Sequence, residues 1–297
     1  MNPVTDDGLL ARDSTAWTAH HSTGLSYAPK DNPFSTLFAD VTHRCNMECP
    51  NCYIPNRDIP DMDAHWLYRV LEQLPRRTRI RLVGAEPTLR KDLPDLIQRV
   101  RELGHTPIVL SNGLSLAKRA YVKKLKAAGL RTVHLSMDGG MRDDLYEAIT
   151  GMACAERKLR ALDNLCAENF FVTVGIILIN QVNVPHIHEF LTHLRQYRNV
   201  REIHFRSIGA MGRHMDTSRS PDLTGMEALL NDALGFRIRD ARSFKQETPT
   251  SIDVRHQGVG YQLTQWPDLH NAHRGRITPE GRIEACFEHL IANEGGY

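Results

Sequence analysis

Three cysteines lie within eight residues of one another, at Cys45, Cys49 and Cys52. Three thiolates in one short loop can bind three irons of a 4Fe-4S cluster, and the absence of a fourth nearby cysteine leaves the last iron open to another ligand. The competing interpretation is a zinc knuckle that adds His43 or a distant ligand. Structural zinc sites usually pair two Cys-x₂₋₄-Cys units, and the chain has no second unit. The spacing therefore favours an iron–sulfur centre with one exchangeable position.

The other three cysteines, Cys154, Cys166 and Cys286, are scattered along the chain. Cys154 and Cys166 fall on or near one helical stretch, about 120° apart around it at ~3.6 residues per turn, so they cannot easily share a cluster. Free cysteine usually behaves as a small core residue, which is the role we expect for these two. A second cluster is therefore not expected.

A regular alternation of strands and helices surrounds the cysteine loop and must position it. Short β-branched runs predict strands at 37–42, 80–83, 107–110, 132–137, 172–179 and 202–207, and amphipathic stretches predict helices at 64–74, 93–103, 117–128, 155–167 and 186–197. Repeated strand–helix units give parallel strands joined by right-handed crossovers, with the functional residues at the carboxyl ends of the strands. The predicted fold is α/β, a partial (β/α)₆ TIM-like barrel, and the cysteine loop follows its first strand.

The segments on either side of this alternation are irregular. Residues 1–34 show neither period and are interpreted as an N-terminal arm or lid, and 35–212 form the barrel core. In 213–297 the pattern fades after one more helix at 226–239, except for a hairpin-like stretch at 276–283. This part is predicted to be a C-terminal extension that covers the substrate.

Composition excludes several classes of protein. Of 297 residues, 41% are hydrophobic and 24% charged, as in ordinary globular domains. No apolar run approaches the ~20 residues of a membrane span, and the N-terminus lacks the features of a secretion signal, so we expect a cytoplasmic protein with no membrane partner. The net charge of +2 indicates no polyanionic partner. Basic runs at 76–81 and 118–131 keep RNA possible, although the second has the spacing of a solvated helix face.

The cysteine loop and the residue after it, Tyr53, resemble the Cys-x₃-Cys-x₂-Cys loop and following aromatic residue of the radical S-adenosylmethionine (SAM) superfamily. Gly84-Ala85-Glu86-Pro87 at the end of the second strand resembles that family's Gly-Gly-Glu-Pro segment, whose backbone contacts the SAM amino group. Ala85 replaces the usual second glycine, which is acceptable only where φ is negative.

Further residues at strand ends resemble the SAM-binding positions of the same superfamily. Ser111 and Asn112 end the third strand, and Ser136 and Asp138 end the fourth, where the family's serine contacts ribose or the methionine carboxylate. Arg206 on the sixth strand is a candidate for a bidentate carboxylate contact. Asp138 could instead cap the next helix, and Arg206 could form an exterior salt bridge.

The resemblance implies one 4Fe-4S cluster held by Cys45, Cys49 and Cys52, with SAM on the open iron. One-electron cleavage of SAM would then give a 5′-deoxyadenosyl radical that abstracts a hydrogen atom from a substrate. A small polar metabolite (a sugar, nucleoside or amino acid derivative) is the first choice of substrate, and a peptide or RNA is the alternative. The implied electron donor is a flavodoxin or ferredoxin. The C-terminal part resembles the start of a SPASM/twitch-type extension without its cysteines. A zinc-stabilised nucleic-acid-binding module is the alternative from another class.

Overall fold

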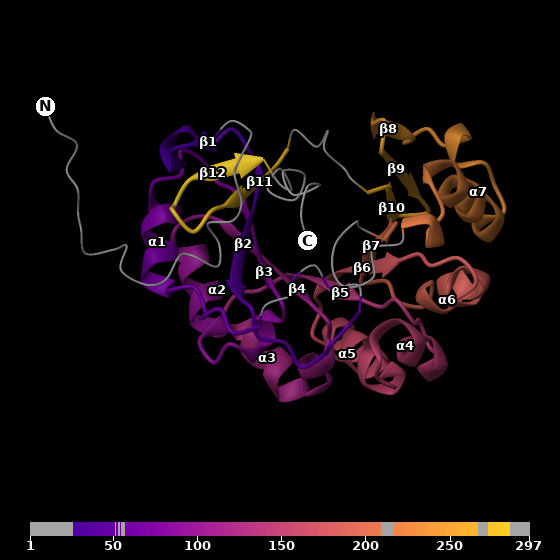
Figure 1. Ribbon diagram of the computed structural model, residues 1–297, viewed down its shortest axis with the longest axis horizontal. Helices are drawn as coiled ribbons and strands as arrows, with labels where there is room; N and C mark the ends of the chain where they lie inside the picture. The colour runs from indigo at the N-terminus through magenta and orange to yellow at the C-terminus, as the bar shows by residue number, and fades with distance from the viewer. Residues whose placement is uncertain are drawn as a thin grey trace, which may run out of the picture.

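One sheet runs through the computed structural model, which describes residues 26–50, 52, 54, 57–208, 217–266 and 273–285. The strand order is β1-β12-β11-β2-β3-β4-β5-β6-β7-β10-β9-β8. Every pair from β2 to β7 is parallel. The helices form an outer arc from α1 past α3 and α5 to α7, with the strands on its inner side (Figure 1). This is the predicted partial barrel.

The six predicted core strands are confirmed with small shifts at their ends. They are β2 (Thr36–Thr42), β3 (Arg79–Gly84), β4 (Thr106–Ser111), β5 (Thr132–Ser136), β6 (Phe171–Ile177) and β7 (Val200–Arg206). The helices between them are α1 (Ala64–Glu72), α2 (Leu93–Glu102), α3 (Arg119–Ala127), α4 (Asp143–Thr150), α5 (Ala155–Ala167) and α6 (Ile187–Leu194). Of these, α4 was not predicted; Gly151, which has a positive φ, separates it from α5.

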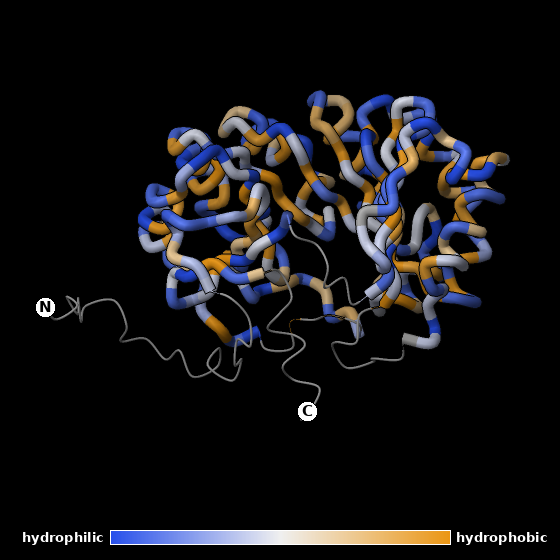
Figure 2. The backbone as a smooth tube through the Cα atoms, turned by 90° about the horizontal axis from the view of Figure 1, so that it is seen from above, coloured by the Kyte–Doolittle hydropathy of each residue, from blue (hydrophilic) through white to orange (hydrophobic). Residues whose placement is uncertain are grey.

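Apolar and polar side chains alternate along the strands, so the two faces of the sheet differ in polarity. In β3, Ile80 and Leu82 are fully buried and belong to the main hydrophobic core, whereas Arg79 and Arg81 on the opposite face line a cavity. Successive strand side chains point to opposite faces, so the apolar set meets the helices and the polar set lines the barrel interior. Figure 2 shows hydrophobic stretches throughout both halves of the molecule.

The C-terminal part contains more regular structure than the sequence analysis predicted. After α7 (Leu223–Leu234) come β8 (Lys245–Thr248), β9 (Ser251–His256) and β10 (Val259–Thr264), and β10 pairs in parallel with β7. The expectation of irregular segments between the predicted helix and the predicted hairpin is wrong. Apolar residues alternate in β9 (Ile252 and Val254) and in β10 (Tyr261 and Leu263), but this period of two is too short in each strand to stand out.

The remaining strands extend the sheet beyond β2. β11 (Arg274–Ile277) pairs in parallel with β2, and it forms the predicted hairpin with β12 (Ile283–Ala285), which in turn pairs with β1 (Ser26–Tyr27). The described parts of both flanking segments thus share one sheet with the barrel, and Phe34, Leu230 and Ile283 join its core. The division at 34 and 212, and the lid role of the flanks, stay predictions. No described helix combines the length and apolar character needed to cross a bilayer.

Candidate functional site

The cysteine loop follows β2, at the end of the barrel where the carboxyl ends of the strands meet. The Cys52 N–H donates to the Cys49 carbonyl oxygen at 3.1 Å, and all three thiols are partly buried. Cys45 and Cys49 pack against a small apolar cluster that contains Met47, Leu114, Tyr146, Cys154 and Ala155. Burial of Cys154, and packing of Cys166 against the main core, match their predicted roles. Tyr53 and Cys286 lie outside the described residues.

Electrostatics of the loop show that its thiols are close to one another. The pKa of Cys49 is raised to about 12, mainly by burial and also by Asp138, Cys52 and Cys45, whereas Lys158 opposes the rise. Burial also raises the pKa of Cys45. The Cys52 Sγ accepts a hydrogen bond of 3.1 Å from Nη2 of Arg57. Burial thus favours the protonated form of Cys45 and Cys49, and the nearby positive charges of Arg57 and Lys158 would stabilise thiolates.

The arrangement of the thiols bears on which metal centre fits. Within the described part of the chain, no three His, Cys, Asp or Glu side chains converge as ligands of a single metal ion. The thiolates of a 4Fe-4S cluster each bind a different iron, so they need not meet at one point. Thiol chemistry and nearby positive charge fit a cluster in this loop.

Gly84 brings the end of β3 against the start of the cysteine loop. Its φ is +133°, and a Cβ at this position would lie 2.1 Å from the Thr42 carbonyl oxygen. The Ala85 N–H donates to the same oxygen at 2.9 Å. Ala85 is not among the residues with positive φ, which confirms the condition under which alanine is tolerated there.

Glu86 is completely buried and joins the end of β3 to the end of β4. Its carboxylate accepts hydrogen bonds from the Thr88 N–H (3.0 Å), Thr88 Oγ1 (2.6 Å), Ser111 Oγ (2.9 Å) and the Asn112 N–H (2.6 Å). Burial raises the pKa of Glu86, and these hydrogen bonds oppose the rise. The carboxylate is therefore committed to the protein, and Glu86 acts by positioning the loops. Pro87 begins a short 3-10 turn, η3 (Pro87–Leu89), beside it.

Asn112 connects these strand ends to the cysteine loop. Its Nδ2 donates to Asn46 Oδ1 at 2.8 Å and lies 3.8 Å from Cys45 Sγ. Residues predicted separately at the ends of β2, β3 and β4 thus meet at one place.

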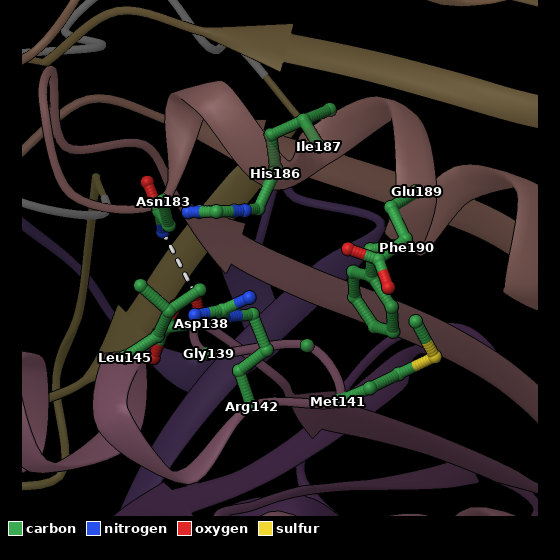
Figure 3. Close-up of a pocket in the computed structure, with 11 residues that line it drawn as sticks. Asp138, Gly139, Met141, Arg142, Leu145, Asn183, His186, Ile187, Glu189 and Phe190 are labelled. Carbon is green, nitrogen blue, oxygen red and sulfur yellow. Dashed lines mark hydrogen bonds between the residues drawn. The ribbon is translucent and has the colours of Figure 1, made fainter.

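Asp138 lies just after β5 and joins it to β6. Its Oδ1 accepts from the Ile177 N–H at 2.7 Å, and its carbonyl oxygen accepts from Asn183 Nδ2 at 2.8 Å (Figure 3). The helix-cap alternative is wrong, because the N-cap position of α4 is Arg142. The adjoining pocket holds only about 10 Å³, the space of roughly one water. The Ser136 carbonyl oxygen accepts from Lys158 Nζ at 2.9 Å.

Arg206 lies inside the barrel. It is two residues after the buried His204 on β7 and so shares its face, and its charge lowers the pKa of both His204 and His134. Burial is the larger cause of both shifts, which keep the two imidazoles neutral. The exterior alternative for Arg206 is therefore wrong.

The structure adds a cationic cavity that the sequence analysis missed. It has a volume of about 500 Å³ and lies at the amino-terminal ends of the strands, opposite the cysteine loop. Its lining contains five cationic side chains and two carboxylates, Glu202 and Asp253. The cations are Arg79, Arg81, Lys245, Arg255 and Arg274. Alternation of Arg79 and Arg81 with Ile80 and Leu82 was the available signal, because in a strand it places both arginines on one face. Lys158 and Arg57 were missed as well, since single basic residues carry no motif.

Comparisons with known proteins agree with this geometry. Residues 40–194 match the family described as the Radical SAM superfamily. A GTP 3′,8-cyclase of Xanthomonas campestris pv. campestris is 31% identical over an alignment of 306 residues, which covers 91% of this chain and 84% of the relative. A 7,8-dihydro-6-hydroxymethylpterin dimethyltransferase of Methanocaldococcus jannaschii is 31% identical over 185 residues, or 59% of this chain.

Among solved structures, Streptococcus suis SuiB bound to its precursor peptide SuiA has the same fold, with a TM-score of 0.64 over 95% of this chain at 16% identity. The chain spans 36% of the length of the dimethyltransferase and 64% of SuiB. The family match covers more than half of the chain and includes the cysteine loop and the ends of β3, β4 and β5. This chain therefore belongs to the radical SAM superfamily.

Proposed function

We propose that this protein is a radical SAM enzyme that acts on a small phosphorylated metabolite of the nucleotide class. Cys45, Cys49 and Cys52 hold the 4Fe-4S cluster that the superfamily uses with SAM. When bound, the cluster supplies the electron that cleaves SAM to methionine and a 5′-deoxyadenosyl radical. The strand-end loops fixed by Gly84, Glu86 and Asn112 hold SAM beside it.

The observation that carries the substrate class is the cationic lining of the barrel interior. Arg81, Arg206 and Arg274 come from three strands, and all three lower the pKa of the buried His134, so their charges converge inside the barrel. One guanidinium group can donate to two phosphate oxygens at once, and several guanidinium groups together can bind a polyphosphate. A neutral or cationic substrate would gain nothing from this positive charge.

The volume and the relatives support the same class. A cavity of about 500 Å³ is within the range of small-molecule sites. Two relatives, from Xanthomonas campestris and Listeria welshimeri, are named GTP 3′,8-cyclase. A nucleotide with its phosphates among the arginines would extend along the barrel toward the cysteine loop.

Peptide modification is the weaker alternative. The solved structures with bound peptides have only 15–17% sequence identity to this chain, so the similarity supports a shared fold and not a shared substrate. A peptide added as a strand needs a free sheet edge, and the two edge strands of the described sheet, β1 and β8, have two and four residues. Edges this short offer few backbone partners.

The test measures 5′-deoxyadenosine after anaerobic reconstitution with iron and sulfide and reduction by dithionite. We expect SAM cleavage to rise with a nucleoside triphosphate and not with the matching nucleoside, and inorganic tripolyphosphate to inhibit competitively. Arg274→Met should raise the KM for the triphosphate at least tenfold, whereas Arg119→Met on the outer helix α3 should not. Equal stimulation by nucleoside and triphosphate would refute the phosphate assignment, and absence of 5′-deoxyadenosine under all conditions would refute the radical chemistry.

A further inference from the structure

Lys158, in the first half of α5, is buried to an unusual degree for a lysine. Only 1% of its surface is exposed, and it is among the largest fully buried side chains of the described chain. Lysine is almost never fully buried unless a partner compensates its charge, because removing an ammonium from water is costly. The position therefore requires a physical reason.

The partners of the Lys158 ammonium compensate its charge only in part. Nζ donates to the Ser136 carbonyl oxygen at 2.9 Å and lies 5.0 Å from the centre of the Tyr146 ring. No described carboxylate lies within ion-pair distance of it. An ammonium has three donors, and one carbonyl and one ring face leave much of the positive charge available to act on other groups.

The groups that feel this charge include Cys49 of the candidate cluster loop. Tyr146 belongs to the small apolar cluster that Cys45 and Cys49 pack against, so a medium of low polarity connects Lys158 to the loop. The charge of Lys158 acts on Cys49 and Cys154. Charges interact more strongly across such a medium than through water.

We propose that Lys158 is a positioning residue whose fixed positive charge offsets the negative charge of the thiolate-bound cluster and raises its reduction potential. Reduction adds one electron to a centre that already carries three thiolates, so a buried cation nearby stabilises the reduced form more than the oxidised form. Its bond to Ser136 also fixes the end of β5. This role depends on the superfamily cofactor and is independent of the substrate class.

The experiment compares Lys158→Met with Lys158→Arg in the full chain, reconstituted anaerobically with iron and sulfide. Iron and sulfide content are measured first, and the midpoint potential is then taken from a dithionite titration followed by electron paramagnetic resonance. Lys158→Met should reduce the equilibrium constant for one-electron reduction by about tenfold, a fall of ~59 mV. Lys158→Arg keeps the charge and should keep the potential.

Lys126, which is only partly buried, provides a control with the same two kinds of contact. Its Nζ also donates to a backbone carbonyl, that of Asn169 at 2.7 Å, and also lies over an aromatic ring, that of Phe170 at 4.7 Å. These contacts are at the start of β6, the end of the barrel opposite the cysteine loop. Lys126→Met should lower the free energy of unfolding without changing the midpoint potential. A potential shift that occurs only in Lys158→Met would therefore result from the lost charge and not from lost packing.

Three outcomes overturn the inference. The first is the same potential in Lys158→Met and the wild type, and the second is an equal shift in Lys126→Met. The third is that Lys158→Met and Lys158→Gln both fail to fold without metal while Lys158→Arg folds, which makes the buried positive charge a requirement of the fold alone. Neither depends on the substrate, so the failure of a nucleotide to stimulate SAM cleavage leaves this test intact.

Discussion

At the scale of single residues, the site depends on backbone conformation as much as on side chains. Gly84 is the clearest case, because its positive φ and its contact with Thr42 leave no room for a Cβ. Its neighbour Ala85 has a conformation that any residue can adopt. Two adjacent positions of one motif thus have opposite tolerances.

We expect Gly84→Ala to lower the free energy of unfolding by more than about 3 kcal/mol, through strain and a backbone clash. Ala85→Gly should cost only ~0.5–1 kcal/mol through chain entropy, and should leave SAM binding unchanged. Urea unfolding of the cluster-free protein, with SAM binding by calorimetry after reconstitution, measures both. Similar losses in the two variants would contradict this account of the motif.

Glu86 makes a second prediction at this scale. In the wild type, four N–H and O–H groups donate to the two carboxylate oxygens of Glu86. Glutamine has nearly the same shape, but it replaces one of these oxygens by an NH₂ group, which cannot accept their hydrogen bonds. Glu86→Gln should therefore destabilise the fold by about 2–4 kcal/mol, since buried donors lose an ionised acceptor. Thermal and urea unfolding check it, with the exposed substitution Glu156→Gln on α5 as control. A change below ~0.5 kcal/mol would show that the carboxylate is not needed.

At the scale of elements, the six core strands were predictable because each combines a β-branched run with a following amphipathic helix. β9 and β10 were not, since they form a short hairpin and depend on pairing with β7 for their burial. The polar face of the strands was equally hard to interpret, because Arg79 and Arg81 look like a surface run in the sequence, whereas the structure places both on the lining of the cavity. The cysteine loop was predictable from spacing alone, whereas the carboxylate contacts of Glu86 depend on how β3 and β4 pair.

Arg90 holds three elements together near the site. Its Nη1 donates to the carbonyl oxygens of Val41 (2.6 Å) and Met62 (2.7 Å), and its Nη2 pairs with Asp92 at 2.6 Å, before α2. The hydrogen bond from Arg90 lowers the pKa of Asp92 below 3.8. This ion pair therefore stabilises the fold above that pH, and the stabilisation is lost as the pH falls through the lowered pKa.

The resulting prediction concerns pH dependence. Between pH 5 and pH 3, the wild type should lose more of its free energy of unfolding than Asp92→Asn, which has no carboxylate to protonate. The difference should stay below about 1 kcal/mol, because Asp92 is 43% exposed and water screens the pair. Urea unfolding of the cluster-free protein at both pH values measures it. Asp232→Asn on the exposed face of α7 should follow the wild type; identical slopes in all three proteins would exclude the proposed linkage.

At the scale of the whole molecule, the sheet closes on itself through side chains. β11 pairs with β2 and β10 pairs with β7, with β3 to β6 between them in the sheet. Arg274 Nη2 nevertheless donates to Gln262 Oε1 at 3.2 Å, so this hydrogen bond connects the two arms of the open barrel beside the cationic cavity. This contact fixes how far apart the arms stand, and with it the width of the candidate phosphate site.

Gln262→Met keeps the length of the side chain and removes the acceptor. We expect a loss of ~1–2 kcal/mol, typical of a hydrogen bond to a charged group, together with faster amide hydrogen exchange in β10 and β11 and unchanged exchange in β4 and β5. Gln98→Met, which removes an exposed hydrogen bond to Glu102 on α2, serves as the control and should change neither. If Arg274 and Gln262 hold the arms together, a bound polyphosphate should restore slow amide exchange in the Gln262 variant, because it offers Arg274 a new acceptor. Fast exchange that persists with the ligand bound would show that the arms are held by their hydrophobic cores alone.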